Sequence, residues 1–115
     1  MELTNGFAGK ILHVDLTSGK IEKIPVTESM VEDSLGGMGF SARILYDRLA
    51  PNTDPLSPDN VFIYSAGILA GTLIPGSCRT EITFKSPLSG LFGDSNSAAP
   101  AQMLKWAGYD NLVVS

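Results

Sequence analysis

The sequence has 115 residues, of which 43% are hydrophobic and 17% charged, so it can bury the core of one globular domain, residues 1–115. Twelve acidic and eight basic side chains give a net charge of −4, and the lysines and arginines are scattered along the chain. The hydrophobic content excludes a disordered chain. The net negative charge and the scattered basic residues argue against a nucleic-acid or anionic-membrane partner.

The N-terminal sequence and the cysteine content indicate where the protein resides. The start MELTNGFAGK has no basic region followed by an apolar core, so it is not a signal peptide, and the single Cys78 cannot form an internal disulfide. The apolar run over residues 61–76 is broken by Gly67, Gly71 and Pro75, whereas a membrane helix needs about 20 apolar residues. We therefore expect a cytoplasmic protein with a buried strand and a glycine loop in this run.

The first half of the chain predicts a β-hairpin followed by two helices. Alternating apolar residues predict that Gly9–Leu16 pairs with Lys20–Val26 around a Thr-Ser-Gly turn. Thr27 is placed to cap a short helix over Glu28–Leu35, which the following Gly-Gly ends. The next helix places four apolar side chains on one face before Pro51 stops it: Phe40, Ile44, Leu45 and Leu49.

The second half predicts three strands and a helix. A turn-rich connector leads into a buried strand, Val61–Ala66, and Arg79–Lys85 and Leu91–Asp94 are the next two strands. Ser97 is then expected to cap a helix over Ala98–Ala107. Together these elements predict an α+β fold with an antiparallel-rich β-sheet and short helices.

The last residues, NLVVS, have the pattern of a strand that begins without a following turn or partner segment. Such a segment would expose an apolar strand edge. We therefore expect the chain to self-associate in a concentration-dependent way or to be poorly soluble.

A stretch rich in glycine, serine and asparagine over residues 76–100 points to an anion site. A helix start at Asn96-Ser97 would expose backbone N–H groups at the positive end of the helix dipole, and the glycines would let a bulky ligand approach. Arg79, at the entry of a strand, offers a planar donor fork to a phosphate or a heterocycle. Together they predict a site for a phosphate-bearing cofactor. The alternative interpretation is that Ser97 only caps a surface helix and that Arg79 is solvated or ion-paired.

Other reactive side chains have plainer interpretations. Cys78 has no second cysteine and one distant histidine, which indicates a packed or inert thiol. His13 lies on a hairpin face and is expected to be structural or solvated. Glu81 and Asp94 could form a carboxylate pair for acid–base chemistry, although nothing in their spacing requires it.

Four ordered motifs carry a resemblance to a known family: SLGGMGFSARILYDRL, DPLSPDNVFIYSAGILAGT, PGSCRTEITFKSPLSGLFGDSNS and LKWAGYDNLVV. In this order they resemble the N-terminal region of the tungsten-dependent aldehyde ferredoxin oxidoreductase family. The resemblance covers nearly the whole chain. It implies an α+β fold with a folded sheet that is duplicated within the family's N-terminal domain, of which this chain would form about half.

The resemblance also implies a cofactor site. Members of the family hold tungsten between the dithiolene sulfurs of two pyranopterins, next to a [4Fe–4S] cluster that passes electrons to ferredoxin. The match places Arg79 between pterin and cluster, the Asn96 backbone carbonyl on the Mg²⁺ that links the pterin phosphates, and the Ala98 backbone facing the cofactor. With the adjacent Ser97, these residues form the predicted cofactor-binding set, and none of them is predicted to be catalytic.

Three departures limit what the resemblance carries over. Met38 stands where the family often has an arginine in its Gly-Gly-x-Gly turn, and Ala98-Ala99-Pro100 replaces residues that are frequently glycine and aromatic. The cluster cysteines of the family lie in later domains, and Cys78 matches none of them. We therefore expect the chain alone to lack stoichiometric tungsten and iron and to oxidise no aldehyde.

The sequence is accordingly interpreted as a non-catalytic N-terminal part of a tungstopterin oxidoreductase, acting with the remaining domains or a catalytic subunit. The parent reaction would oxidise an aldehyde to a carboxylate, with water as the oxygen source and ferredoxin as the electron acceptor. Two alternatives remain open. One is a stand-alone module that binds a phosphorylated ligand, and the other is an assembly subunit of a larger oxidoreductase complex.

Overall fold

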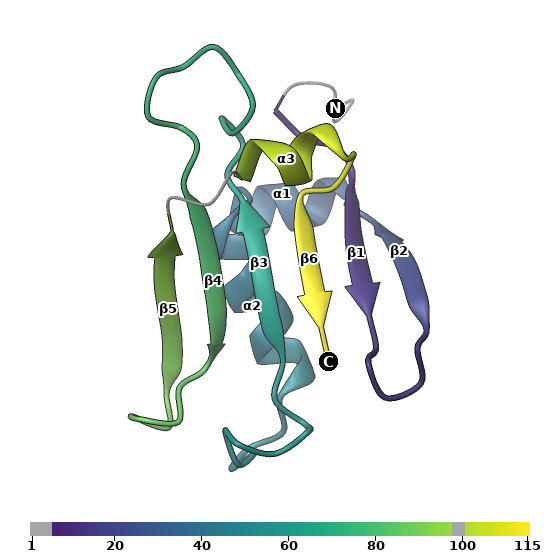
Figure 1. The fold of residues 1–115 in the computed structure, drawn as a ribbon, viewed down its shortest axis with the longest axis vertical. Helices are drawn as coiled ribbons and strands as arrows, with labels where there is room; N and C mark the ends of the chain where they lie inside the picture. The colour runs from purple at the N-terminus through teal and green to yellow at the C-terminus, as the bar shows by residue number, and fades with distance from the viewer. Residues whose placement is uncertain (1–5, 98–100) are drawn as a thin grey trace.

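The computed structural model describes residues 6–97 and 101–115 and contains a six-stranded mixed sheet with three short helices (Figure 1). The strands lie in the order β2-β1-β6-β3-β4-β5. In chain order the elements are β1 (Lys10–Val14), β2 (Ile21–Pro25), α1 (Glu28–Ser34), α2 (Met38–Arg48), β3 (Phe62–Ala66), β4 (Thr80–Lys85), β5 (Phe92–Ser97), α3 (Ala101–Trp106) and β6 (Asn111–Val114). The predicted α+β class is confirmed.

The elements predicted from local patterns are present. β1 and β2 form the predicted antiparallel hairpin, with Lys10 opposite Pro25. The Thr27 side chain accepts a hydrogen bond from the Met30 amide at 3.3 Å and caps α1, as expected. The helix ends at Ser34, and the next residue, Leu35, has a positive φ of 59° that turns the chain out of the helix before the two glycines.

The apolar core lies between the sheet and the pair α1–α2, which covers one face of the sheet (Figure 1). Its buried members come from four strands or their flanks and from both helices: Ile11, Val26, Val31, Phe40, Leu45, Val61, Ile63 and Val113. Ile44 and Leu49 pack against this cluster, so the predicted apolar face of α2 is confirmed. α3 packs separately, through Ala101 against Ala66 and Ala70.

The position of the last strand corrects the sequence-based expectation. β6 lies inside the sheet, parallel to β1 and antiparallel to β3, with Val113 opposite Ile63. Both of its edges are therefore paired, and the prediction that NLVVS exposes an apolar edge is wrong. The expected self-association loses its structural basis. The physical reason is burial: Val113 of β6 is 1% exposed and packs in the apolar core with Ile11 and Ile63 of the two neighbouring strands.

The strand β5 corrects a second expectation. The predicted short strand continues to Ser97, which pairs with Thr80 of β4. Ser97 is therefore a strand residue, and the predicted strand end at Asp94 is wrong, because the ladder with β4 extends over six residue pairs. The predicted cap concerns the helix start at residues 98–100, which lie outside the described residues. Among the described residues, α3 begins at Ala101.

No helix within residues 6–97 and 101–115 combines the length and the apolar character that a membrane crossing requires.

Candidate functional site

Arg79 lies at the end of the sheet where β4 begins and β5 ends. The next residue, Thr80, pairs with Ser97, and the carbonyl of the preceding Cys78 accepts a hydrogen bond from the Ala101 amide at 3.3 Å. The structure therefore brings Arg79 next to the end of β5 and to α3. The side chain is exposed, and no hydrogen bond or ion pair engages it among the described residues.

Arg79 borders a shallow hollow of about 290 Å³, called the Arg79 hollow below. Its other lining residues come from the loop between β3 and β4: Gly67, Ile68, Leu69, Ala70, Gly76 and Ser77. A Cβ atom built on Gly67 or Gly76 would meet no other atom within 4 Å, so at both positions the bare backbone faces open space. A cation beside accessible backbone is an arrangement that suits an anionic group.

The register of β5 decides which way its backbone groups point. The Ser86 amide donates to the Leu91 carbonyl at 2.8 Å, which marks these residues as a hydrogen-bonded pair of the antiparallel ladder. Hydrogen-bonded pairs recur at every second residue of an antiparallel ladder, so the backbone N–H and C=O groups of Ser95 and Ser97 also point toward β4. The N–H and C=O groups of Asn96 therefore point away from β4, toward the open edge of the sheet.

The predicted site residues are thus only partly brought together. Asn96 and Ser97 are consecutive residues of a strand, so their side chains lie on opposite faces of the sheet. Arg79 and the outward backbone of Asn96 lie at the same end of the β4–β5 pair. Ala98 lies outside the described residues.

Glu81 and Asp94 form a carboxylate pair, which their spacing in the sequence allowed but did not require. Glu81 lies opposite Asn96, and Asp94 lies opposite Thr83, so the two carboxyl groups meet diagonally on one face. Burial raises the pKa of Glu81, and the charge of Asp94 and a hydrogen bond to it add to the increase. The cross-strand register, which determines this contact, is not visible in the sequence spacing alone.

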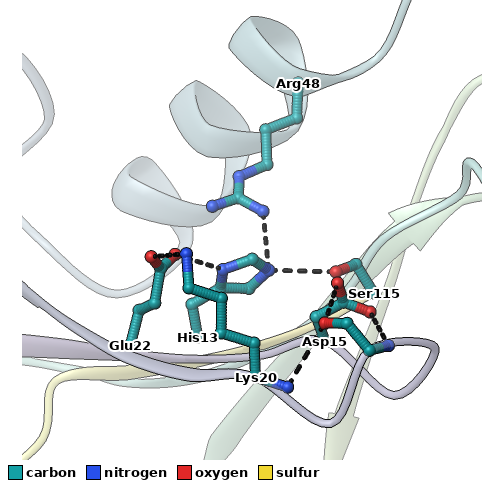
Figure 2. Close-up of polar contacts among 7 residues, drawn as sticks. His13, Asp15, Lys20, Glu22, Arg48 and Ser115 are labelled. Carbon is teal, nitrogen blue, oxygen red and sulfur yellow. Dashed lines mark hydrogen bonds and ion pairs between the residues drawn. The ribbon is translucent and has the colours of Figure 1, made fainter.

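A second polar cluster lies at the opposite end of the sheet (Figure 2). His13 Nε2 is 2.9 Å from both Arg48 Nη1 and Ser115 Oγ, and Nδ1 is 3.5 Å from Glu22 Oε2. A guanidinium can only donate, so Nε2 is an acceptor and the ring proton lies on Nδ1, facing Glu22. The row Ser115, His13, Glu22 has the residue types of a nucleophile, a base and an acid. However, Arg48 shares the Nε2 lone pair that such a base would need.

Asp15 and Lys20 extend this cluster around the hairpin turn. Asp15 Oδ1 accepts from the Thr17 and Ser18 amides at 2.9 and 3.1 Å, and Oδ2 accepts from the Ser18 hydroxyl at 2.6 Å. The hydrogen bonds from Ser18 lower the pKa of the Asp15 carboxyl group. Lys20 Nζ lies 2.6 Å from Glu22 Oε1. These contacts agree with the interpretation of His13 as a structural residue.

Comparison with known proteins matches almost the whole chain. The profile of the family "Aldehyde ferredoxin oxidoreductase, N-terminal domain" matches residues 11–115. A tungsten-containing aldehyde ferredoxin oxidoreductase of Pyrococcus abyssi is 37% identical over 110 residues, which are 95% of this chain. The WOR-like subunit of an aliphatic sulfonate oxidoreductase of Pyrococcus furiosus is 35% identical over 112 residues. The chain spans 18% of the length of each of these two relatives.

A solved structure shares the same fold. It is the active site complex BamBC of benzoyl coenzyme A reductase in complex with 1,5-dienoyl-CoA, with a TM-score of 0.91 and 40% sequence identity. The match covers 96% of this chain and 17% of that chain. The sequence-based resemblance and the α+β fold that it implies are therefore confirmed.

Proposed function

The chain belongs to the aldehyde ferredoxin oxidoreductase family, whose N-terminal domain it matches, and we propose that it forms part of the platform for the tungstopterin cofactor of a larger oxidoreductase. The observation that carries the proposal is the common position of Arg79 and the outward backbone of Asn96 at one end of the β4–β5 pair. The family resemblance points to both residues, and the strand register supports the choice of Asn96 by directing its backbone groups away from β4.

Arg79 is proposed to bind the phosphate arm of a pterin. Its guanidinium is exposed beside the accessible backbone of Gly67 and Gly76, so a phosphate can enter without displacing a side chain. Charge-assisted hydrogen bonds from an arginine fork are directional as well as strong, which would fix the orientation of the arm.

The Asn96 carbonyl is proposed to bind the Mg²⁺ that links the pterin phosphates. Magnesium prefers oxygen ligands, and a backbone carbonyl on an open sheet edge has a lone pair available without breaking the ladder to β4. Ser97 and Ala98 complete the proposed binding set. When bound, the tungstopterin supplies two-electron oxidation chemistry, while the residues of this chain only bind and orient it.

The remaining parts of the reaction are proposed to lie elsewhere in the parent enzyme. A [4Fe–4S] cluster is held by four thiolates, and this chain has one cysteine. We accordingly place the cluster, the aldehyde site and the ferredoxin contact in the remaining domains or a catalytic subunit.

The test is an Arg79→Ala change in the full-length parent enzyme or in a complex reassembled with this chain. We expect it to weaken retention of the phosphorylated pterin by about 1.5–3 kcal/mol, as for loss of a charge-assisted contact, and to leave the fold intact. Arg43→Ala is the matched control, because Arg43 is an exposed arginine on α2 that pairs with Asp47 at 2.8 Å, away from the hollow. Pterin and tungsten content after dialysis would be compared. Equal retention in Arg79→Ala and Arg43→Ala would contradict the proposal.

A further inference from the structure

A buried ion pair joins the end of α3 to the beginning of β6. Lys105 Nζ lies 2.5 Å from Asp110 Oδ1, and the two side chains are only 8% and 2% exposed. Burying both charges costs hydration free energy that offsets much of their attraction, so the best-attested role of such pairs is to fix geometry. The contacts of this pair indicate that it fixes the N-terminal segment, residues 6–9.

Both partners bind the backbone of the N-terminal segment. Asp110 Oδ1 accepts a hydrogen bond from the Ala8 amide at 3.0 Å, and Oδ2 accepts one from the Gly9 amide at 2.8 Å. Lys105 Nζ donates to the Gly6 carbonyl at 2.5 Å. The segment would lose three of its anchoring contacts if the pair were removed.

The N-terminal segment in turn lies against the loop that follows β3. A Cβ on Gly6 would lie only 3.1 Å from the Ile68 carbonyl oxygen. The Phe7 ring stacks on Phe40 with 6.1 Å between centroids. A Cβ on Gly36 would lie 3.3 Å from Phe7 and 3.0 Å from Ile68, so Phe7 of the segment and Ile68 of the loop both pack close to Gly36.

Ile68 is also a lining residue of the Arg79 hollow. We infer that the Lys105–Asp110 pair is a positioning device: it holds the N-terminal segment against Ile68 and thereby sets the shape of the hollow in which Arg79 receives a phosphate group. Lys105 and Asp110 act through the segment and the loop and do not contact the ligand. The inference rests on the proposed function only for the identity of that ligand.

The test measures the loop directly, without a ligand. The double variant Lys105→Met, Asp110→Asn removes both charges, so that neither is left buried alone. The control is Arg43→Met, Asp47→Asn, an exposed pair on α2. The Ala70 and Thr72 amides, which donate to Gly67 and Leu69 within the loop, report on its order through hydrogen exchange.

We expect these two amides to exchange about tenfold faster in the double variant, while amides of the β3–β4 ladder keep their wild-type protection. Gly6→Ala is a second variant that leaves the ion pair intact. Its Cβ would meet the Ile68 carbonyl from a φ of +86°, so it should produce the same loop-specific change if the double variant does not fold. Unchanged loop exchange, or an increase shared equally by the ladder, would overturn the inference.

Inorganic pyrophosphate is the probe for the hollow itself, with binding followed by phosphorus NMR. We expect its affinity to fall about fivefold or more in the double variant and to remain at the wild-type level in the α2 control. If wild-type chain does not bind pyrophosphate at all, the phosphate role in the proposed function fails, and the amide measurement still decides the positioning role.

Discussion

The two ends of the sheet both carry polar side chains, but only one end leaves them available to a ligand. At the His13 end, Arg48 Nη1 lies 2.9 Å from His13 Nε2 and Lys20 Nζ lies 2.6 Å from Glu22, so the charged groups of the cluster contact one another (Figure 2). At the Arg79 end, the guanidinium is exposed and, in the described part of the chain, has no side-chain partner.

The comparison indicates that, in this domain, the number of reactive side chains in a cluster does not identify the ligand-binding site. A ligand at the His13 end would have to break contacts that already satisfy the ring and the guanidinium, at the cost of leaving polar groups unpaired. A ligand that binds the Arg79 guanidinium would break no side-chain hydrogen bond or ion pair of that group among the described residues. The sparser end is therefore the better candidate site.

The largest expected effect is a loss of folding stability when the buried Lys105–Asp110 pair, which we infer to position the Arg79 hollow, is broken. Asp110→Ala would leave the 8% exposed Lys105 ammonium buried without its partner, and removing one member of a buried pair costs about 3–5 kcal/mol. The free energy of unfolding would be measured by urea denaturation. Asp47→Ala, which removes an exposed carboxylate on α2, is the control and should change stability little. Similar losses in the two variants would contradict the special position of Asp110.

Effects of intermediate size on stability and on pyrophosphate affinity should distinguish the His13 end of the sheet from the Arg79 end. Arg48→Ala removes the contact to His13 and is expected to lower stability by about 0.5–1.5 kcal/mol, the usual net worth of a hydrogen bond, without changing pyrophosphate affinity. Arg79→Ala is expected to do the reverse: it should lower the affinity and leave the free energy of unfolding nearly unchanged. Denaturation and phosphorus NMR on both variants test the crossed pattern, and a loss of affinity in Arg48→Ala would break the comparison.

The sequence predicts well the features that depend on near neighbours. The hairpin follows from the alternation of apolar residues around a glycine turn. The start of α1 follows from Thr27, whose hydroxyl accepts a hydrogen bond from the Met30 amide in the first turn of the helix. Arg79 could be selected because a lone arginine enters a strand directly after a glycine loop. Each of these inferences requires only a few consecutive residues.

Features set by distant pairing could not be predicted from these patterns. The apolar NLVVS segment has the same local pattern at a sheet edge as in its interior, and only its pairing with the distant strands β1 and β3 places β6 inside the sheet. Ser97 satisfies the residue preference of a helix cap, but the ladder to Thr80 makes it the end of a strand. The contacts of Asp110 with Ala8 and Gly9 span about a hundred residues, so no local motif announces them.

The smallest expected effect concerns the pair Glu81–Asp94, which lies beside the Asn96 edge. Burial and the Asp94 charge raise the pKa of Glu81 in the folded chain above its ordinary value of 4.5. Between the unfolded and the folded value, the folded chain binds more protons than the unfolded chain. Stability is therefore highest below the unfolded value and falls as pH rises through this window.

Glu81→Gln should remove this pH dependence. The variant should be more stable than the wild type at pH 7 by less than about 1 kcal/mol, because the partly solvated pair is screened, and the difference should vanish below the unfolded pKa. Urea denaturation at several pH values measures it, with the exposed Glu32→Gln on α1 as the control. A variant that is less stable than the wild type at neutral pH would show that Glu81 gains more from its surroundings when ionised than it loses by burial.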